Sequence, residues 1–316
     1  MSSRQIENSD RVLVIGASSV DVVGRLQADL QLATSNPALI RTSYGGVARN
    51  VAENLARLGQ PVNLLSVIGK DRLGEDVLAH TRAAGVDVSA VYSTDLYPTG
   101  FYMGILNEHG ARHFAVADMR VLEELSETYL DYNEFLFEHA AMVFLDANLP
   151  EPALKKAFAL AHKYHVPVCA DPVSGAMAAR LKPYLRQIRL LTPNNIEAGV
   201  LTGTHFEAGN RDAALEAARA LISMGAEMVF VSLAEYGLCY ASAETSGHIP
   251  AIRTAVSDPT GAGDALTAAV IFAMLNNIEI DDAAMLGVSA ATITLRYHGT
   301  VDPDLTLEKL YDEFVI

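Results

Sequence analysis

The sequence predicts an α/β fold in which a mostly parallel central sheet is covered by helices. Short apolar segments typical of buried strands alternate along the chain with amphipathic helical segments, which is the pattern of successive βα units. The chain has no internal repeat, no low-complexity tract and no long linker rich in Pro, Gly or Ser. We therefore expect residues 1–316 to form a single α/β domain.

The alternation assigns most of the chain to strands and helices. The predicted strands are residues 11–16, 62–68, 141–146, 167–171, 189–191 and 227–232. The predicted helices are residues 47–58, 73–84, 152–164, 211–224, 261–276 and 281–297. The first of these helices shows the signal clearly, because Val47, Val51 and Leu55 recur at helical spacing before Gly59 ends it.

Two segments interrupt the alternation. Residues 20–44 are too long for an ordinary βα connection and carry no strong helical pattern. Residues 99–106 and 111–118 alternate around Asn107-Glu108-His109-Gly110, which is a hairpin signal. We expect these insertions, at about residues 20–44 and 97–118, to form a small β-element outside the main sheet. Such an element is a lid in some enzymes and surface decoration in other proteins, and the pattern alone favours neither.

Charge and composition exclude several classes of partner. The formal net charge is -15, from 23 basic and 38 acidic residues, so we expect no nucleic acid polymer and no anionic membrane as partner. No apolar run is long enough to span a membrane, and the polar residues 1–10 lack the apolar core of a signal peptide. Cys169 and Cys239 lie in apolar segments and are expected to be buried reduced thiols. Together these features predict a cytoplasmic protein.

The strongest local signal for chemistry is the segment Asp258-Pro259-Thr260-Gly261-Ala262-Gly263-Asp264. Its small residues precede a long predicted helix, so several backbone N–H groups and the helix N-terminus can surround developing negative charge. Asp264 is placed to take a proton from a substrate hydroxyl. By spacing alone, however, the segment is better explained as a glycine-rich turn in which Asp264 stabilises the helix N-terminus.

A second cluster, Gly45-Gly46-Val47-Ala48-Arg49-Asn50, opens the first predicted helix. Its glycine pair permits close approach of a ligand, and Asn50 and Asn54 place two amides on one helix face. Competing phosphate motifs are missing from the sequence, including the G-x-x-x-x-G-K-[ST] loop and the H-R-D and D-F-G pair of protein kinases. The turn before Asp264 also lacks the third glycine of a dinucleotide site, which disfavours a nicotinamide dehydrogenase.

Together the two clusters resemble the hallmark segments of the ribokinase-like (PfkB) carbohydrate kinase family, in the same order and at similar positions. Two further elements support the resemblance. Thr192-Pro193-Asn194-Asn195-Ile196-Glu197 resembles the family's N-x-x-E element, and residues 232–237 resemble its nucleotide loop S-x-G-x-x-G. The resemblance covers essentially the whole chain. It implies a three-layer α/β/α fold with a small β lid, and a kinase that uses ATP and Mg²⁺ to phosphorylate a small hydroxylated molecule.

The resemblance also implies a role for each matching residue. Asp264 would be the catalytic base, and the backbone amides of Gly261, Ala262 and Gly263 would surround the transferred phosphoryl group. The residues implied to bind the sugar hydroxyls are Ser19, Asp21, Gly45, Gly46 and Asn50. Those implied to bind ATP are Asn194, Ser232, Gly237 and Thr260, while Glu197 would hold Mg²⁺ and Asp258 would lie with Thr260 at a site for K⁺.

Two positions depart from the family pattern. Ala234 replaces the first glycine of the nucleotide loop and would be strained if the loop needs a positive φ at this position. Ser19 stands where many relatives carry Asn, so one contact to the sugar is expected to be shorter or changed.

Within the family the chain is most similar to the pseudouridine kinases, which phosphorylate the 5′-hydroxyl of that nucleoside. The similar segments are Ser35-Asn36-Pro37, residues 45–55, Asp171-Pro172-Val173-Ser174 and residues 302–306. On this interpretation the lid covers the nucleobase and Thr99, Tyr102 and Asp118 contact it, although exposed hairpin residues would give the same pattern. A kinase of ribose, uridine or adenosine shares every motif, and an inactive ligand-binding protein is a further alternative. Lid strands in this family often pair between subunits, so the resemblance also suggests a homodimer.

Overall fold

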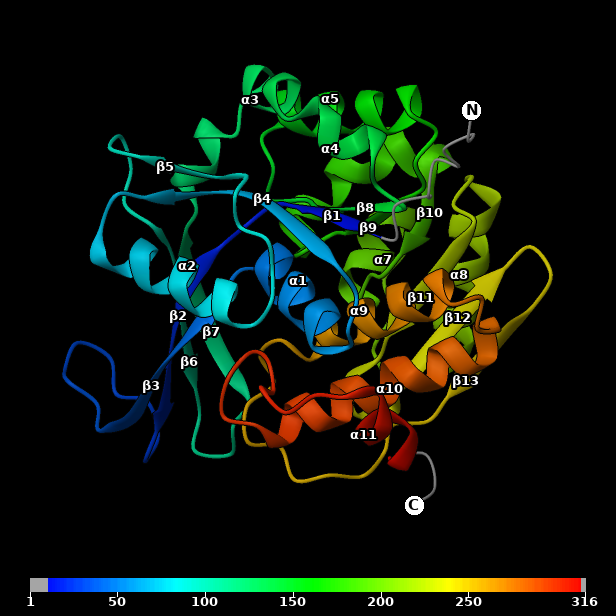
Figure 1. The fold of residues 1–316 in the computed structure, drawn as a ribbon. Helices are drawn as coiled ribbons and strands as arrows, with labels where there is room; N and C mark the ends of the chain where they lie inside the picture. Colours follow the sequence, from blue (N-terminus) through cyan, green and yellow to red (C-terminus); the bar gives the residue numbers. More distant parts are fainter. Residues whose placement is uncertain (1–10, 314–316) are drawn as a thin grey trace, which may run out of the picture.

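The computed structural model describes residues 11–313, and residues 1–10, for which no signal peptide is expected, lie outside the described part. Within that part, a nine-stranded sheet runs through the centre of the molecule in the order β13-β12-β11-β10-β9-β8-β1-β4-β5 (Figure 1). Its strands are β1 (Val12–Ile15), β4 (Val62–Gly69), β5 (Val91–Thr94), β8 (Met142–Asp146), β9 (Val168–Asp171), β10 (Ile188–Leu191), β11 (Met228–Ser232), β12 (Leu238–Ser242) and β13 (Ser246–Ile249). Every neighbouring pair from β11 to β5 is parallel, and β12 is antiparallel to both of its neighbours. The predicted mostly parallel sheet is confirmed.

The central strands are buried on both faces, and their continuous apolar sequences explain why. In β1, Val12 and Val14 pack into one hydrophobic cluster, while Leu13 and Ile15 pack into a second cluster on the opposite side of the sheet. Successive side chains of a strand point to opposite faces, so a parallel strand between two helical layers needs apolar residues at every position.

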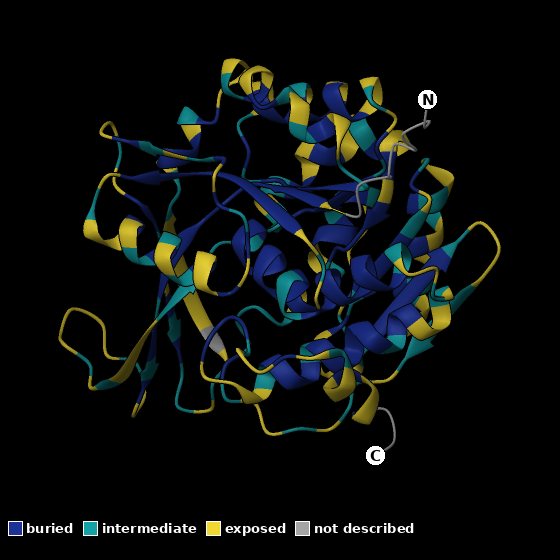
Figure 2. Ribbon diagram, in the orientation of Figure 1, coloured by how far each residue is buried: buried dark blue, intermediate teal, exposed yellow. Residues whose placement is uncertain are grey.

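Helices cover both faces of the sheet, as Figure 1 shows, and buried residues concentrate in the sheet and in the helices nearest to it (Figure 2). One layer contains α1 (Val47–Arg57), α9 (Ala262–Leu275), α10 (Ile280–Arg296) and α11 (Leu307–Asp312). The other contains α3 (Glu127–Tyr132), α4 (Glu134–Glu138), α5 (Glu151–Lys163), α7 (Asn195–Thr202) and α8 (Arg211–Ser223). The remaining helices are α2 (Arg72–Ala83), the single turn α6 (Gly175–Ala178), and three 3₁₀ helices at Arg120–Glu124, Ala179–Gln187 and Ala234–Tyr236.

The two insertions form a second, smaller sheet, which we call the lid sheet. It has the order β3-β2-β6-β7 and consists of β2 (Ser19–Leu26), β3 (Ala38–Gly45), β6 (Gly100–Leu106) and β7 (Arg112–Asp118). In Figure 1 the lid sheet projects from one side of the main sheet, next to α2. The predicted hairpin is β6 and β7, and the segment for which no helix was expected supplies two paired strands. The three-layer ribokinase-like arrangement with a small β lid is therefore the observed fold.

Several elements were not predicted from the sequence. The strands β5 and β13 contain four residues each, and most of these residues are partly exposed, so they carry little hydrophobic signal. Helix α7 is eight residues long and begins at a capping box between Asn194 and Glu197. The prediction also lacked strand β12 and helices α3, α4, α6 and α11. The bounds of the strands and helices that were predicted agree with the observed ones to within about two residues.

Two predictions from composition can be compared with the described residues. Cys169 and Cys239 are both buried free thiols, as predicted. Between residues 11 and 313 we find no helix that combines the length and the apolar character needed to cross a membrane.

Candidate active site

A cavity of about 830 Å³ lies between the lid sheet and the carboxyl ends of the central parallel strands. Its wall includes Ala17 after β1, Asp171 at the end of β9, Thr192 after β10 and Ser232 at the end of β11. The chain continues from β1 to β4 on one side of the sheet, whereas β8 lies on the other side of β1, so the direction of strand order reverses here. Ligands of open α/β sheets bind at such a reversal, outside the carboxyl ends of the strands.

The N-terminus of α9 faces this cavity without a side-chain cap. Gly261 precedes the helix with φ 84°, a left-handed conformation that glycine adopts readily. A Cβ atom on Gly261 would lie 2.0 Å from the carbonyl oxygen of Thr300, so only glycine fits. Gly263 lines the cavity, and a Cβ on it would meet no atom within 4 Å. The first N–H groups of this 14-residue helix are therefore free to bind an anion.

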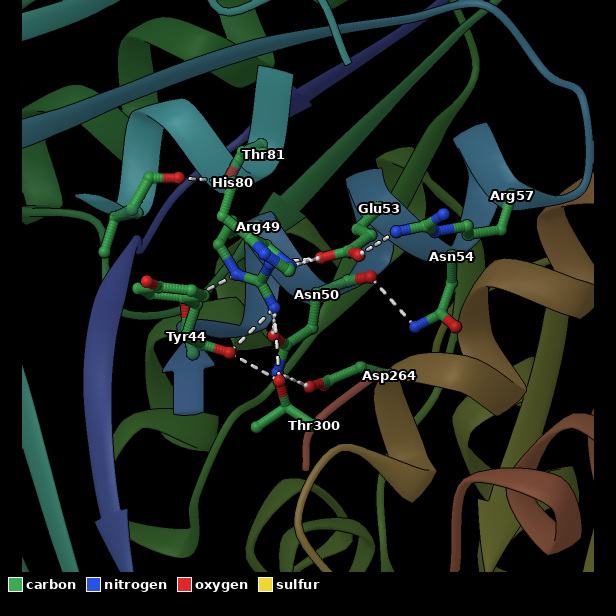
Figure 3. Close-up of polar contacts among 12 residues, drawn as sticks. Tyr44, Arg49, Asn50, Glu53, Asn54, Arg57, His80, Thr81, Asp264 and Thr300 are labelled. Carbon is green, nitrogen blue, oxygen red and sulfur yellow. Dashed lines mark hydrogen bonds and ion pairs between the residues drawn. The ribbon is translucent and has the colours of Figure 1, made fainter. Parts of the chain in front are cut away.

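Asp264 lies in the first turn of α9 and is buried at the edge of the cavity. Its Oδ2 accepts a hydrogen bond of 2.6 Å from Nδ2 of Asn50, which belongs to α1 (Figure 3). Burial raises the pKa of Asp264 to about 7; the nearby carboxylates of Asp21 and Asp146 add to this, while Asn50 and Arg49 oppose it. A carboxylate with a pKa near neutrality is a suitable general base at physiological pH.

The first lid strand brings Ser19 and Asp21 to the same cavity. The hydroxyl of Ser19 donates to Oδ1 of Asp21 at 2.8 Å, and both side chains are buried. Burial raises the pKa of Asp21 to about 6, although the Ser19 hydrogen bond and the charge of Arg49 lower it. A Cβ atom on Gly45 would lie 2.0 Å from Oδ1 of Asp21, which explains the first glycine of the pair. The result is a buried carboxylate with room beside it for a hydroxylated ligand.

At the other end of the cavity, Asn194 and Glu197 form the capping box that begins α7. The Asn194 side chain accepts from the Glu197 N–H at 3.0 Å, and the Glu197 carboxylate accepts from the backbone and side-chain nitrogens of Asn194 at 2.9 and 2.7 Å. Burial raises the pKa of Glu197 to about 7. The pKa of Asp171 is also raised, by burial first and then by the charges of Glu197 and Asp264. This region of clustered carboxylates would be stabilised by a cation.

The segment that follows β11 contains the departure noted in the sequence. Ala234 adopts φ 49°, so alanine does stand at a position with a left-handed backbone. Gly237 closes the turn with φ 97°, and a Cβ on it would lie 2.1 Å from the carbonyl oxygen of Ile249. The loop therefore keeps the conformation that suits glycine, at the expense of strain at Ala234.

Most residues singled out from the sequence meet at this cavity. Those that line it are Ser19, Asp21, Gly46, Asn50, Tyr102, Asn194, Glu197, Ser232, Thr260, Gly261, Gly263 and Asp264. Those outside its lining are Gly45, Thr99, Asp118, Gly237, Asp258 and Ala262. Gly45 and Ala262 are chain neighbours of lining residues, and Asp258 is buried with its Oδ1 accepting from the N–H of Thr260 at 2.9 Å.

Two of the suggested nucleobase contacts have other partners. The hydroxyl of Thr99 donates to Oδ1 of Asp71 at 2.6 Å and is buried beside the N-terminus of α2. Asp118 forms an ion pair of 2.6 Å with Arg120, whose hydrogen bonds lower the pKa of Asp118 to about 2. Arg120 itself lines the cavity, as does Tyr102. The geometry therefore supports Tyr102, but not Thr99 or Asp118, as a residue that reaches a ligand.

The sequence did not single out Asp146, which is completely buried at the end of β8. Its Oδ2 accepts from the N–H groups of Ala17 at 2.8 Å and Ala48 at 3.2 Å, so it joins β8, β1 and the first turn of α1. Burial raises its pKa to about 6 against the effect of these hydrogen bonds. Asp146 and Asp171 both end predicted parallel strands, and a carboxylate at that position is a signal that sequence reasoning can use.

Comparison with known proteins agrees with this geometry. The chain matches the model of the pfkB family carbohydrate kinases over residues 9–307. It is 32% identical over 310 residues to the pseudouridine kinase of Escherichia coli (strain K12), with 96% of each chain covered. It is 26% identical over 284 residues to the guanosine-inosine kinase of Exiguobacterium acetylicum, covering 89% of this chain and 93% of that relative.

The fold also matches a solved structure. Arabidopsis thaliana ribokinase complexed with ribose and ATP superposes with a TM-score of 0.83 at 22% identity, covering 97% of this chain and 99% of that one. The match over nearly the whole chain, together with the family model and the pseudouridine kinase relative, places the protein among sugar and nucleoside kinases. The chain belongs to the pfkB family of carbohydrate kinases.

Proposed function

We propose that the protein is a kinase that uses ATP and Mg²⁺ to phosphorylate the 5′-hydroxyl of a nucleoside, with pseudouridine as its preferred substrate. The observation that carries this proposal is the position of Asp264 beside the uncapped N-terminus of α9, in a cavity that also exposes Asp21 and Asn50. A base, an anion-binding turn and a site for hydroxyl groups are the parts that phosphoryl transfer to an alcohol requires.

The position of each residue supports the role that we propose for it. Asp264 takes the proton of the attacking hydroxyl, and the N–H groups of Ala262 and Gly263 bind the transferred phosphoryl group. Gly261 holds the turn in shape. Asp21, Ser19 and Asn50 bind the sugar hydroxyls, with Gly45 and Gly46 giving the ligand space. ATP lies toward Asn194, Ser232 and Thr260, and Gly237 shapes the loop after Ser232.

The carboxylates near the ATP side fit a magnesium ion carried by the nucleotide. Glu197 and Asp171 present hard oxygen atoms to the cavity, and their raised pKa values indicate that a cation would favour their ionised forms. The residues that the structure describes contain no group of three or more His, Cys, Asp or Glu arranged to hold a metal by themselves. Mg²⁺ commonly keeps water and phosphate oxygens as most of its ligands and neutralises the transferred charge.

The substrate assignment draws on the cavity and on similarity. The lid sheet contributes Tyr102, Ala115 and Ala117 to the cavity wall, which gives an aromatic ring and small residues where a nucleobase would lie. The 32% identity to the Escherichia coli pseudouridine kinase supports pseudouridine. The guanosine-inosine kinase relative supports a purine nucleoside as the competing candidate, and ribose, uridine and adenosine complete the set.

The test is a panel of acceptors assayed by ADP release. Pseudouridine, uridine, inosine, adenosine and ribose are compared with and without EDTA, and Asp264→Asn serves as the control for contaminating kinases. We expect pseudouridine to have the highest kcat/KM of the panel, and we expect EDTA to abolish its phosphorylation. A much higher kcat/KM for ribose or inosine would show that the substrate assignment is wrong and that the kinase assignment is right. If no acceptor is phosphorylated, the kinase assignment is wrong and the ligand-binding alternative is favoured.

The site for K⁺ is a separate part of the proposal. Asp258 is buried and Thr260 begins the turn before α9, so a monovalent cation held here would stabilise the turn that binds the phosphoryl group. Assays in KCl and in NaCl at equal ionic strength distinguish activation by K⁺ from a salt effect.

We also propose that the lid sheet joins two copies of the chain. The face of the lid sheet turned away from the cavity exposes Ile40, Met103, Phe114 and Val116, which are 70%, 38%, 49% and 59% exposed. A contiguous exposed apolar patch commonly marks a protein interface. Light scattering is expected to give a molar mass of twice 33.9 kDa for the wild-type protein. Phe114→Glu is expected to lower this mass toward that of one chain.

A further inference from the structure

A buried arginine lies next to the candidate base and has no assigned role. Arg49, on α1, is 1% exposed, and its guanidinium donates hydrogen bonds in several directions (Figure 3). They reach the carbonyl oxygens of Gly45 at 3.0 Å and Tyr44 at 2.8 Å, the carboxylate of Glu53 and the side-chain oxygen of Asn50. Arginine is seldom buried unless its charge is paired and its N–H groups are hydrogen-bonded. The partners of Arg49 meet both requirements.

The contact with Asn50 determines which way that amide points. Nη2 of Arg49 donates to Oδ1 of Asn50, which leaves Nδ2 of Asn50 directed at Oδ2 of Asp264, 2.6 Å away. A flipped amide would place its oxygen against the Asp264 carboxylate and its NH₂ group against the guanidinium, and both contacts would be repulsive. Arg49 therefore selects the orientation in which Asn50 donates to the base.

Glu53 holds the guanidinium in place. It is 1% exposed and pairs with Arg49 through Oε2 and with Arg57 through Oε1, one helical turn away in each direction. His80 of α2 also lies 3.2 Å from Oε2. Burial opposes the charge of Glu53, but the hydrogen bonds and charges of His80 and Arg49 outweigh it and lower its pKa to about 2. The anchor is thus ionised throughout the range in which an enzyme operates.

The same guanidinium connects the lid to the turn before α9. Nη2 of Arg49 donates to the hydroxyl of Thr300 at 3.1 Å, and that hydroxyl donates to the carbonyl oxygen of Tyr44 in β3. The carbonyl group of Thr300 is the one that packs against Gly261. One side chain therefore touches the lid strand, the partner of the base and the residue that supports the anion-binding turn.

We propose that Arg49 is a positioning residue that orients Asn50, so that Nδ2 of Asn50 donates to the Asp264 carboxylate and favours the form of Asp264 that accepts the substrate proton. This inference rests on the proposed kinase function in assigning the proton transfer to Asp264, but its structural part does not require turnover.

The charged groups that face Asp264 give the expected direction of change. Asp21 from β2 and Asp146 from β8 disfavour its ionised form, and Arg49 from α1 is the cation that opposes them. Asp171 from β9 also faces Asp264, and the charge of Asp264 raises the pKa of Asp171. Removing Arg49 leaves the charges of Asp21 and Asp146 uncompensated and frees the Asn50 amide to turn away from Asp264. The pKa of Asp264 is then expected to rise further, which lowers kcat/KM by up to about tenfold on the acid side of the profile.

The chain offers a matched control, because Arg49 and Arg57 pair with the same carboxylate but only Arg49 touches Asn50 and Thr300. We would compare Arg49→Met with Arg57→Met. Since Arg49→Met leaves the buried Glu53 with less compensation, the double variant Arg49→Met/Glu53→Met, which removes both charges, guards against a failure to fold. The readouts are the pH profile of kcat/KM and the ¹³C NMR titration of the Asp264 carboxyl in the ligand-free protein. Its resonance is identified by its loss in Asp264→Asn.

In both Arg49 variants, the pKa of Asp264 from the NMR titration and the acid limb of the kcat/KM profile are expected to move to higher pH. In Arg57→Met, both are expected to stay at their wild-type positions. A loss of activity that is equal at every pH, with an unchanged titration, would mean that Arg49 is only structural and would overturn the inference. If the wild-type protein phosphorylates no acceptor, the kinase proposal fails, while the NMR titration still decides whether Arg49 sets the state of Asp264.

Discussion

Asn50 donates a hydrogen bond of 2.6 Å to the carboxylate of Asp264, across 214 positions of sequence. It joins α1, which begins after the glycine pair, to the first turn of α9, which begins after Gly261. The two sequence segments that carry the resemblance to the family are thus physically one site.

Replacing Asp264 with Asn tests its role as the base. Asn is similar in size but cannot accept the proton, so kcat is expected to fall by roughly two to four orders of magnitude while substrate still binds. Steady-state kinetics and calorimetric titration with the nucleoside measure the two effects. Asp95→Asn, which changes an exposed carboxylate paired with Lys70, serves as the control and is expected to have wild-type activity. Near-normal turnover of Asp264→Asn would exclude this residue as the base.

The pH dependence of the wild-type enzyme follows from the raised pKa of Asp264. Because the base works only when ionised, kcat/KM is expected to increase with pH up to about 7 and then level off. An acid limb that begins near the ordinary carboxyl value of 3.8 would contradict the environment described here.

The stability of the ligand-free protein should depend on the same group. The folded pKa of Asp264 is raised from 3.8 to about 7, so its stabilising effect is complete below the unfolded value and is lost as the pH rises through 7. Asp264→Asn lacks this dependence and is expected to gain stability relative to the wild type between about pH 5 and pH 8, by on the order of 2–3 kcal/mol. Urea unfolding at several pH values measures the difference, and a constant difference would show that Asp264 is not perturbed.

The two glycines of the turn before α9 should respond differently to alanine. Gly261→Ala places a methyl group against the carbonyl of Thr300 at a positive φ, so the unfolding free energy is expected to fall by more than about 1 kcal/mol. Gly263→Ala meets no protein atom and is expected to keep or slightly increase stability. Its methyl group would nevertheless enter the space of the phosphoryl group and lower kcat/KM at least about tenfold. Equal stability of the two variants would contradict the assigned geometry.

The strained alanine of the nucleotide loop offers a stabilising change. Ala234→Gly relieves the φ of 49°, which costs about 1–2 kcal/mol for a residue with a Cβ, against an entropic loss of about 0.5–1 kcal/mol for glycine. A net gain of about 0.5 kcal/mol is expected in urea unfolding. Gly237→Ala in the same loop is the opposing control, since its Cβ would meet the carbonyl of Ile249 and destabilise the protein. If Ala234→Gly destabilises the protein, the loop does not store strain at that residue.

Much of the fold could be predicted because its signals are local. The apolar run Val12–Ile15 indicates a strand buried on both faces, and Val47, Val51 and Leu55 indicate the buried face of α1. Short edge strands such as β5 and β13 escaped prediction because partial exposure removes the apolar pattern. The lid was predicted from a turn signal and from an unusually long connection. Its position over the cavity, however, depends on the pairing of β2 with β6, whose paired residues lie about eighty positions apart in the sequence.

By itself the sequence determined that Asp264 follows a glycine-rich turn at the start of a helix, because glycine spacing and helical periodicity act over a few residues. Only the tertiary structure decided what surrounds that residue. Burial raises the pKa of Asp264, and the approach of Asp21 and Asp146, which come from two different strands, raises it further although no local pattern joins these residues. The buried Arg49 and the carbonyl of Thr300 were likewise invisible in the sequence, since burial, amide orientation and close backbone contact exist only once distant segments have packed together.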